Sequence, residues 1–309
     1  MIKINKFFVL IISIFICVLL IEITLRVKGI GSNNIVYYSS NYYGYYQIPD
    51  QKITRRGNLI SLDNYGNRNS KKNTLENSSL IFLGDSITYG GSVVSNNETF
   101  SYLVANKMNL NYLNISSNGW GIPNIINFLE FHNLYKKNST YILTCINDCY
   151  FRNLRKIEQN FFSSKKDYLA INVLLRYLIF NILKKSYSVD HEIISEKLDN
   201  LKTANISVNI LNNFKKKLDS LNSKLIIIHS PNKERMKDLI INQSNNEKYS
   251  RKSILRIFSN YDLELVEISD HFKEKEIENF AHFFVDSVHL SKMGHKIYAD
   301  IIFKLLNES

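Results

Sequence analysis

Two short groups of residues in this chain have the types and the spacing that nucleophilic catalysis requires. Ser86 follows Gly84 and Asp85 at the end of an apolar run, and Asp286 stands three residues before His289. A serine hydroxyl is unreactive at neutral pH, so it needs a histidine base. That histidine in turn needs a carboxylate to orient its ring and stabilise its charged form. The two groups therefore predict Ser86 as nucleophile, His289 as base and Asp286 as its partner.

The stretch around Ser86 admits two interpretations on its own. Residues 80–83 are apolar and are followed by turn-forming residues, which is typical of a buried parallel strand. Open α/β sheets carry their chemistry at the carboxyl ends of such strands, which favours a nucleophile at Ser86. Gly84-Asp85-Ser86 equally suits an ordinary turn in which the serine caps a helix. A base and a set of hydrogen-bond donors elsewhere in the chain are needed to decide.

Attack on a carbonyl also requires donors for the negative charge that develops on its oxygen. We expect these donors to be the backbone amides of Ser86 and Gly119 and the side-chain amide of Asn147. Gly119 suits this role because a residue without a side chain lets the substrate approach the backbone closely. Each such donor contributes about 10² to 10³ in rate.

Strand and helix patterns alternate from residue 80 onward. We expect strands at 80–83, 112–115, 140–145, 225–228 and 263–268, and helices at 99–108, 125–134, 210–221 and 291–306. This alternation predicts a five-stranded parallel sheet with helices on both faces, a three-layer αβα sandwich. The stretch 150–200 breaks the pattern. We interpret its apolar part, 168–183, as an amphipathic insertion that covers the site or rests on a membrane.

The amino-terminal segment is apolar over residues 7–21 and is preceded by Lys3 and Lys6. With the apolar residues that follow, it reaches roughly the 20 residues needed to span a bilayer. A cleaved signal peptide is the rival, but no small-residue cleavage site follows the run. We expect a signal anchor over 1–28, with the bulk of the chain outside the cytoplasmic membrane, in the periplasm or outside the cell.

A polar juxtamembrane segment is expected at 29–79, ahead of a hydrolase-like domain at 80–309. A tyrosine cluster at 37–46 suits either the membrane interface or the edge of the domain. The net charge of +11 suits an anionic membrane or an acidic polysaccharide, and it equally reflects a compositional bias toward lysine. No nucleic-acid-binding pattern is present.

Histidine and cysteine spacing matches no metal-ligand set, so we expect no metal and no cofactor. Of the three cysteines, Cys145 and Cys149 flank Asn147, and we expect them to be packed thiols, although they could pair. His229 and His295 are expected to be structural.

Four groups taken together resemble the SGNH (GDSL-type) hydrolases of the membrane-anchored bacterial type. They are Gly84-Asp85-Ser86, Asn118-Gly119, Asn147-Asp148 and Asp286-Ser287-Val288-His289. The resemblance covers residues 80–306 apart from the insertion. It implies a flavodoxin-like fold, hydrolysis of esters, and catalytic roles for Ser86, Gly119, Asn147, Asp286 and His289. One departure is Cys145, where the family usually has glycine.

The resemblance and the anchor together predict a serine esterase that removes acyl groups, with acetyl on a cell-envelope glycan as the expected substrate. An O-acyltransferase working through the same serine is the nearest alternative. A lipase and a catalytically inactive envelope-binding protein are the others, since a fold alone does not define a function.

Overall fold

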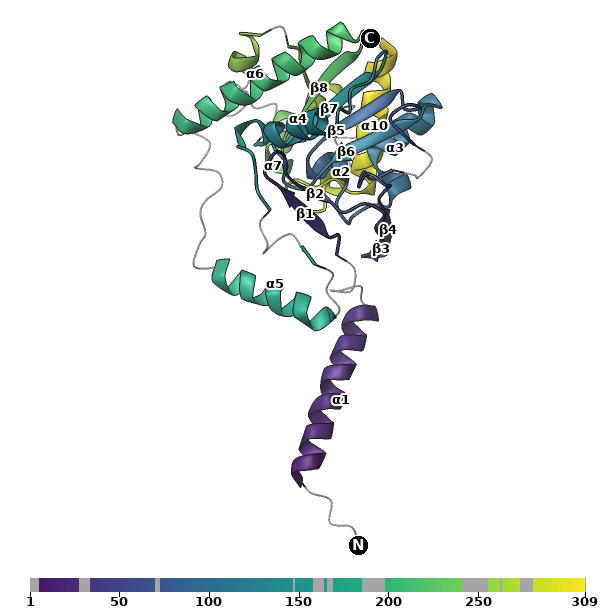
Figure 1. The fold of residues 1–309 in the computed structure, drawn as a ribbon, viewed down its shortest axis with the longest axis vertical. Helices are drawn as coiled ribbons and strands as arrows, with labels where there is room; N and C mark the ends of the chain where they lie inside the picture. Colours follow the sequence, from purple (N-terminus) through teal and green to yellow (C-terminus); the bar gives the residue numbers. More distant parts are fainter. Residues whose placement is uncertain are drawn as a thin grey trace.

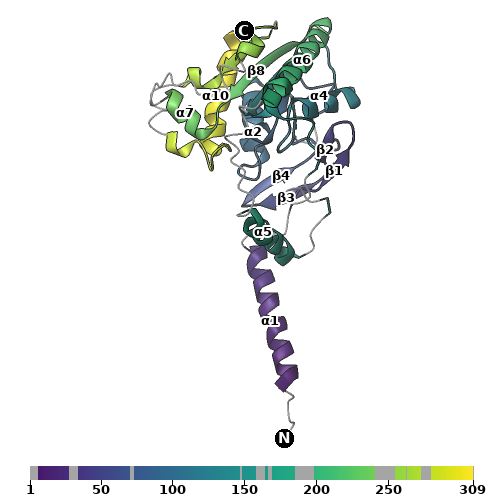
Figure 2. The ribbon, with the colours of Figure 1, turned by 90° about the vertical axis from the view of Figure 1, so that its left-hand side faces the viewer.

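The computed structural model describes residues 6–27, 34–69, 73–146, 148–157, 164–165, 169–184, 198–240, 255–261, 263–272 and 280–308. An α/β domain is joined to a helix that projects away from it, α1 (Lys6–Val27) (Figure 1). A second helix, α5 (Ala170–Lys184), lies near the end of α1 that faces the domain (Figures 1 and 2).

The domain is organised around a sheet of five parallel strands. They are β5 (Leu80–Gly84), β6 (Tyr112–Ser116), β7 (Thr140–Ile146), β8 (Lys224–Ser230) and β9 (Leu265–Glu267). Their order across the sheet is β6-β5-β7-β8-β9. This is the order of the flavodoxin-like doubly wound fold, in which the second strand lies outside the first. The predicted fold class is therefore confirmed.

Helices cover both faces of this sheet because alternate strand residues point to opposite sides. Ile81 and Leu83 pack on the side of α4 (Ile122–Phe131) and α6 (Leu198–Ser220). Leu80 and Phe82 pack on the side of α3 (Phe100–Met108) and α10 (Lys292–Glu308). The remaining short helices are α2 (Ser86–Tyr89), α7 (Lys233–Ile240), η1 (Asn96–Glu98), η2 (Cys149–Phe151), η4 (Ile268–His271) and η5 (Phe280–His282).

Helix α6 begins at Leu198, well before the start predicted at residue 210. Its first half is held by a narrow stripe of small residues, Ala204, Ser207 and Val208, each of which is buried. Because polar residues separate these three, the sequence shows no clear apolar periodicity in this part of the helix.

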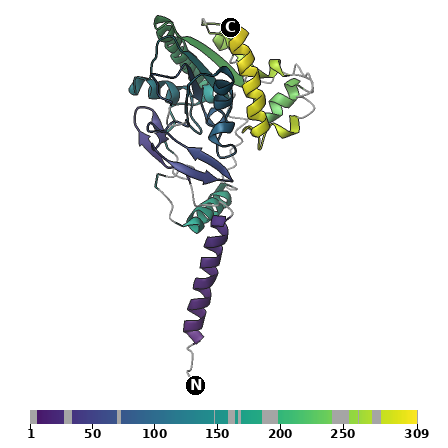
Figure 3. The ribbon, with the colours of Figure 1, turned by 90° about the vertical axis from the view of Figure 1, so that its right-hand side faces the viewer.

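The chain between α1 and the sheet forms two antiparallel hairpins. They are β1 (Tyr37–Ser40) with β2 (Gly44–Gln47), and β3 (Lys52–Arg55) with β4 (Asn58–Ser61) (Figure 3). Tyr46 is fully buried, with its ring 5.0 Å from that of Trp120 and 4.2 Å from that of Phe128. The tyrosine cluster thus packs on the α/β domain, which is one of its two expected positions. The domain boundary at residue 80 stays a prediction.

Helix α1 is long and apolar enough to cross a membrane. Its 22 residues span about 33 Å, close to the roughly 30 Å of a hydrocarbon core. Most of its residues are apolar, and most of these are exposed in the structure. A signal sequence would satisfy the same criteria.

Replacing Tyr46 by Ala tests whether the hairpins fold as one unit with the sheet. We expect the free energy of unfolding to fall by about 3 to 5 kcal/mol, because the change removes a fully buried aromatic ring. Tyr42→Ala is the matched control: Tyr42 is 67% exposed, and we expect its loss to stay below about 0.5 kcal/mol. Urea unfolding of both variants in detergent makes the measurement. Equally small losses would show that the hairpins unfold separately.

Candidate active site

Ser86 stands where β5 turns into α2, at the carboxyl end of the sheet. Asp85 caps α2, because its side chain accepts a hydrogen bond of 3.1 Å from the Ile87 N–H. The turn depends on Gly84, where a Cβ atom would come within 2.2 Å of the Thr88 hydroxyl and 2.3 Å of the Thr144 carbonyl oxygen. Glycine thus lets the Thr88 hydroxyl donate to Thr144 at 3.0 Å, which fixes α2 against β7.

Asp286 and His289 form a directly bonded pair in the loop before α10. The His289 Nδ1 atom lies 2.7 Å from Asp286 Oδ2, and Asp286 Oδ1 accepts from the N–H groups of Val288 and His289 at 2.9 and 2.7 Å. Partial burial alone would raise the pKa of Asp286, but these N–H groups and the His289 ring hold it below its ordinary value. The carboxylate therefore stays ionised and directs Nε2 of His289 away from itself.

Contacts from two sides fix this loop at the carboxyl edge of the sheet. The Lys233 N–H, just after β8, donates to the Ser287 carbonyl oxygen at 2.8 Å. At the start of α10, Lys292 pairs with Glu98 at 2.8 Å, and His295 accepts from the Phe100 N–H at 3.2 Å. The Asp286–His289 pair and Ser86 thus both lie at the carboxyl end of the sheet. Among the described residues, no hydrogen bond joins the Ser86 hydroxyl to the His289 ring.

Gly119 lies in the loop that follows β6, next to β5. The Trp120 N–H donates to the Ser117 carbonyl oxygen at 3.3 Å, and Gly119 has φ +76°. A turn of this kind needs a positive φ at its third residue, which favours glycine. The first hairpin holds the loop, since the Tyr45 hydroxyl donates to the Asn118 carbonyl oxygen at 2.6 Å.

The loop after β7 carries a covalent crosslink. Cys145 and Cys149, both fully buried, form a disulfide with 5.9 Å between their Cα atoms. The expectation of two packed thiols is therefore wrong. Residues at opposite ends of a five-residue turn come close enough to bond, which spacing alone did not decide. The predicted donor Asn147 lies between them, outside the described residues.

Arg152 connects the three loops that follow β5, β6 and β7. Its guanidinium group binds Asp148 with Nε at 3.0 Å and Nη2 at 2.6 Å. Nη1 donates to the Trp120 carbonyl oxygen at 2.7 Å and lies 3.4 Å from Asp85 Oδ2. The predicted site residues did not include Arg152. Its only signal in the sequence was the position of an arginine four residues after Asp148.

Asp85 and Arg152 are a buried charge pair. Asp85 is fully buried and the Arg152 side chain is 12% exposed. Burial raises the pKa of Asp85 above its ordinary value, and the positive charge of Arg152 opposes that rise. Asp85 therefore acts as a loop-organising carboxylate, and its charge depends on the guanidinium.

Two further histidines are packed as expected. His295 is buried and stacked on Phe100, and burial lowers the pKa of His295 to about 3, so its ring is neutral. His229, also buried, has its Nδ1 atom 2.7 Å from Glu267 Oε2. Both rings thus have structural partners in the core.

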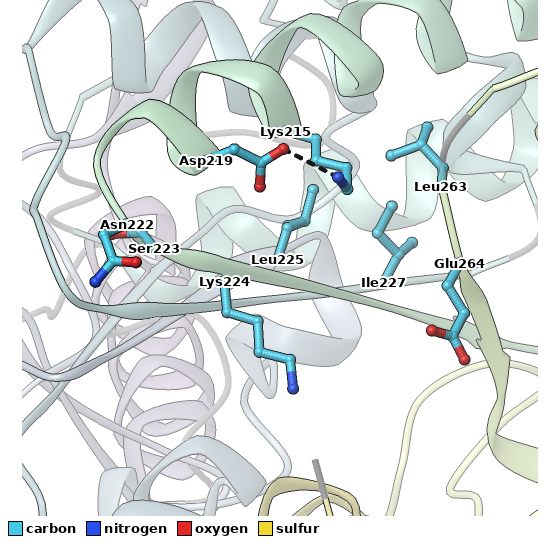
Figure 4. A pocket seen from close by; sticks show the side chains of 9 residues that line it. All are labelled: Lys215, Asp219, Asn222, Ser223, Lys224, Leu225, Ile227, Leu263 and Glu264. Carbon is cyan, nitrogen blue, oxygen red and sulfur yellow. Dashed lines mark hydrogen bonds and ion pairs between the residues drawn. The ribbon is translucent and has the colours of Figure 1, made fainter.

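A cavity of about 470 Å³ lies at the other end of the sheet. It is bounded by Asp219 and Lys215 of α6, which form an ion pair at 3.0 Å, by the start of β8 at Lys224, and by Glu264 (Figure 4). Because Ser86 follows the carboxyl end of β5, this cavity is separate from the candidate active site. Among the residues whose positions are described, no group of three or more His, Cys, Asp or Glu side chains could hold a metal ion.

No known sequence family matches the chain, and no curated protein matches it. Several solved structures are similar to it, including the following three. A member of the lipolytic protein G-D-S-L family from Veillonella parvula is 13% identical, with 74% of this chain and 98% of that chain aligned and a TM-score of 0.41.

A two-domain esterase active on acetylated mannans is 18% identical, with 74% of this chain and 48% of that chain aligned and a TM-score of 0.41. A carbohydrate esterase family 2 enzyme with a carbohydrate-binding domain, from Myceliophthora fergusii, is 10% identical, with 74% and 65% aligned and a TM-score of 0.40. At these values the fold class rests on the strand order of this chain, and no activity is carried over.

Replacing Arg152 by Met should destabilise the domain by about 3 to 5 kcal/mol at neutral pH, because it leaves Asp85 charged and buried without a partner. The pKa of Asp85 in the folded state should then rise further above its unfolded value. A carboxyl group that binds its proton more tightly in the folded state favours folding at low pH and disfavours it as the pH rises through that raised pKa. The difference in unfolding free energy between wild type and Arg152→Met should therefore become smaller as the pH is lowered. Urea unfolding at several pH values measures this difference.

The matched control is the double variant Arg152→Met with Asp85→Asn. Because this variant lacks the Asp85 carboxyl group, its loss of unfolding free energy relative to wild type should not depend on the titration of that group. Parallel stability curves for wild type and Arg152→Met would contradict the coupling of the two residues.

Proposed function

We propose that this protein is a serine esterase in which Ser86 is the nucleophile and His289 the general base. The observation that carries the proposal is the Asp286–His289 hydrogen bond of 2.7 Å, in a loop at the same edge of the sheet as Ser86. A carboxylate that holds Nδ1 leaves Nε2 to accept a proton from a serine. This arrangement favours a nucleophile at Ser86 over a serine that only belongs to a turn.

The reaction proceeds through two acyl transfers. The Ser86 oxygen attacks the ester carbonyl carbon while His289 takes the hydroxyl proton, and the resulting tetrahedral intermediate collapses when His289 gives that proton to the departing alcohol. Water then attacks the acyl group on Ser86 in the same way and releases the acid. Asp286 stabilises the charged His289 in both steps, and its lowered pKa keeps it ionised.

The negative oxygen of each tetrahedral intermediate is bound by the backbone N–H groups of Ser86 and Gly119 and by the Asn147 side chain. The turn at Gly119 supports this assignment, because its positive φ presents bare backbone beside the end of β5. Arg152 acts as a positioning element because it joins the loops that carry these donors, and the disulfide does so because it ties together the two ends of the loop after β7.

The substrate we propose is an acyl ester, with acetyl the expected group, on a glycan of the cell envelope. The Asp286 and His289 side chains are 51% and 34% exposed, so a bulky polymer can reach them. The apolar helix α1 supports anchoring in the cytoplasmic membrane. Disulfides persist outside the cytoplasm, so the Cys145–Cys149 bond supports a domain in the periplasm or outside the cell.

Replacing Ser86 by Ala should abolish both hydrolysis of an acetyl ester and labelling by a serine-directed phosphonate, because no other group forms the acyl intermediate. His289→Ala should lower both by several orders of magnitude, since the hydroxyl then loses its base. The measurements are acetate release from acetylated polysaccharide and mass spectrometry of the labelled chain. Transfer of the acetyl group to an added sugar, or a preference for long acyl chains, would instead indicate a transferase or a lipase.

Ser287→Ala and His282→Ala are matched controls, because both residues are exposed and lie close to the pair in sequence. They should keep nearly full activity. Wild-type turnover by Ser86→Ala would remove that residue from the mechanism.

Reduction of the Cys145–Cys149 disulfide by a phosphine should lower kcat more than it changes KM. The reason is that the crosslink fixes both ends of the loop that carries the Asn147 donor, and misplaced donors weaken transition-state binding. The double variant Cys145→Ser with Cys149→Ser should show the same loss without reductant and no further loss with it. An unchanged kcat in both cases would show that the disulfide has no positioning role.

A further inference from the structure

Helix α5 carries an apolar face that no part of the described chain covers. Leu175, Leu178 and Ile179 are 50%, 45% and 55% exposed, and their spacing places them on one side of the helix. Nearer the start of the helix, Ala170 is buried and Leu174 is half-buried. A contiguous apolar patch of this kind marks a surface for a membrane or a partner.

The first turn of α5 is bonded to α1 through one carboxylate. Glu22 accepts hydrogen bonds from the N–H groups of Ala170 and Ile171, at 2.9 and 3.0 Å on its two oxygens, and from Arg26 at 2.6 Å. The first N–H groups of a helix have no acceptor within the helix, and negative charge is favourable beside them. The Glu22 side chain is 12% exposed, so this contact fixes the start of α5 on α1.

The position of Glu22 along α1 defines where α5 would lie relative to a membrane that α1 spans. Glu22 precedes the end of α1 at Val27 by five residues, or about 7.5 Å along the axis. If α1 spans a hydrocarbon core of about 30 Å, Glu22 comes close to its domain-side boundary. Figures 1 and 2 show α5 beside that end of α1, between it and the sheet.

We propose that α5 lies in the plane of the membrane surface, with Leu175, Leu178 and Ile179 in contact with lipid and Glu22 fixing it to α1. The surface that fits is a bilayer with anionic headgroups, because α5 contains Arg176 and Lys184 and no acidic residue. This inference rests on the proposed membrane anchoring and is independent of esterase activity. The chain then meets the membrane through two connected helices, which limits how the domain can tilt.

The test uses the full-length chain in vesicles of phosphatidylethanolamine and phosphatidylglycerol, with brominated lipids as quenchers. A polarity-sensitive fluorophore is attached at Leu178→Cys in a Cys17→Ser background. We expect a blue-shifted emission that brominated lipid removes almost completely. The matched control is Leu59→Cys in the same background, since Leu59 is a comparably exposed apolar residue on β4 of the domain. Its emission should be unaffected.

The native Cys17 in α1, exposed in the structure, reports on anchoring separately. If a fluorophore on Cys17 is quenched and that at residue 178 is not, the placement of α5 is overturned while the anchor stands. If neither is quenched, anchoring fails and the inference fails with it. Glu22→Gln should weaken quenching at residue 178, because a neutral amide binds the two N–H groups and Arg26 less strongly. Undiminished quenching would overturn the role of Glu22.

Discussion

The Arg152 guanidinium group makes the contacts on which the candidate active site depends. In a parallel sheet, the loops that follow the strands all begin at the carboxyl end of the sheet, but nothing in the sheet itself holds these loops together. Arg152 binds Asp85 after β5, the Trp120 carbonyl oxygen after β6 and Asp148 after β7. A lysine could not replace it, because only a planar guanidinium presents several donors at fixed angles. Gly121 provides the space that Arg152 needs, because a Cβ atom at residue 121 would come within 2.6 Å of the Arg152 Cβ atom.

The first hairpin supports the same edge from outside the sheet. The Tyr45 hydroxyl donates a hydrogen bond to the Asn118 carbonyl oxygen. The Tyr45 carbonyl oxygen accepts one from the Trp120 indole N–H at 2.9 Å. Arg68 is fully buried and donates to the carbonyl oxygens of Tyr89, at the end of α2, and of Gly91, in the loop that follows it. Residues ahead of the sheet thus shape the surroundings of both Ser86 and Gly119. The linker from α1 to the sheet is therefore part of the structure that holds the site.

Local patterns were enough to predict the sheet, while contacts between distant segments were not visible in the sequence. The apolar run at Leu80–Leu83 defined β5 to within one residue, because a strand buried on both faces must be apolar throughout. The Asp286–His289 bond was also predictable, since three residues of spacing bring the two side chains together. Arg152 and Asp85 are separated by 67 positions, so only the folded chain brings them together. The hairpins were missed because their strands are only four residues long and are interspersed with serine, glycine and asparagine.

The two halves of the candidate triad are organised by different parts of the fold. The Asp286–His289 pair is internally bonded in the loop that precedes α10, whereas Ser86 is fixed by β5, α2 and the Arg152 contacts. The missing hydrogen bond between Ser86 and His289 in the described structure fits this division, because catalytic contacts often tighten only when substrate binds. The loop 285–289 is supported at the Ser287 carbonyl oxygen by the Lys233 N–H, and just beyond its end by the ion pair of Lys292 with Glu98. Neither support engages the His289 ring, whose Nδ1 atom is bonded to Asp286, so Nε2 is left to face the serine.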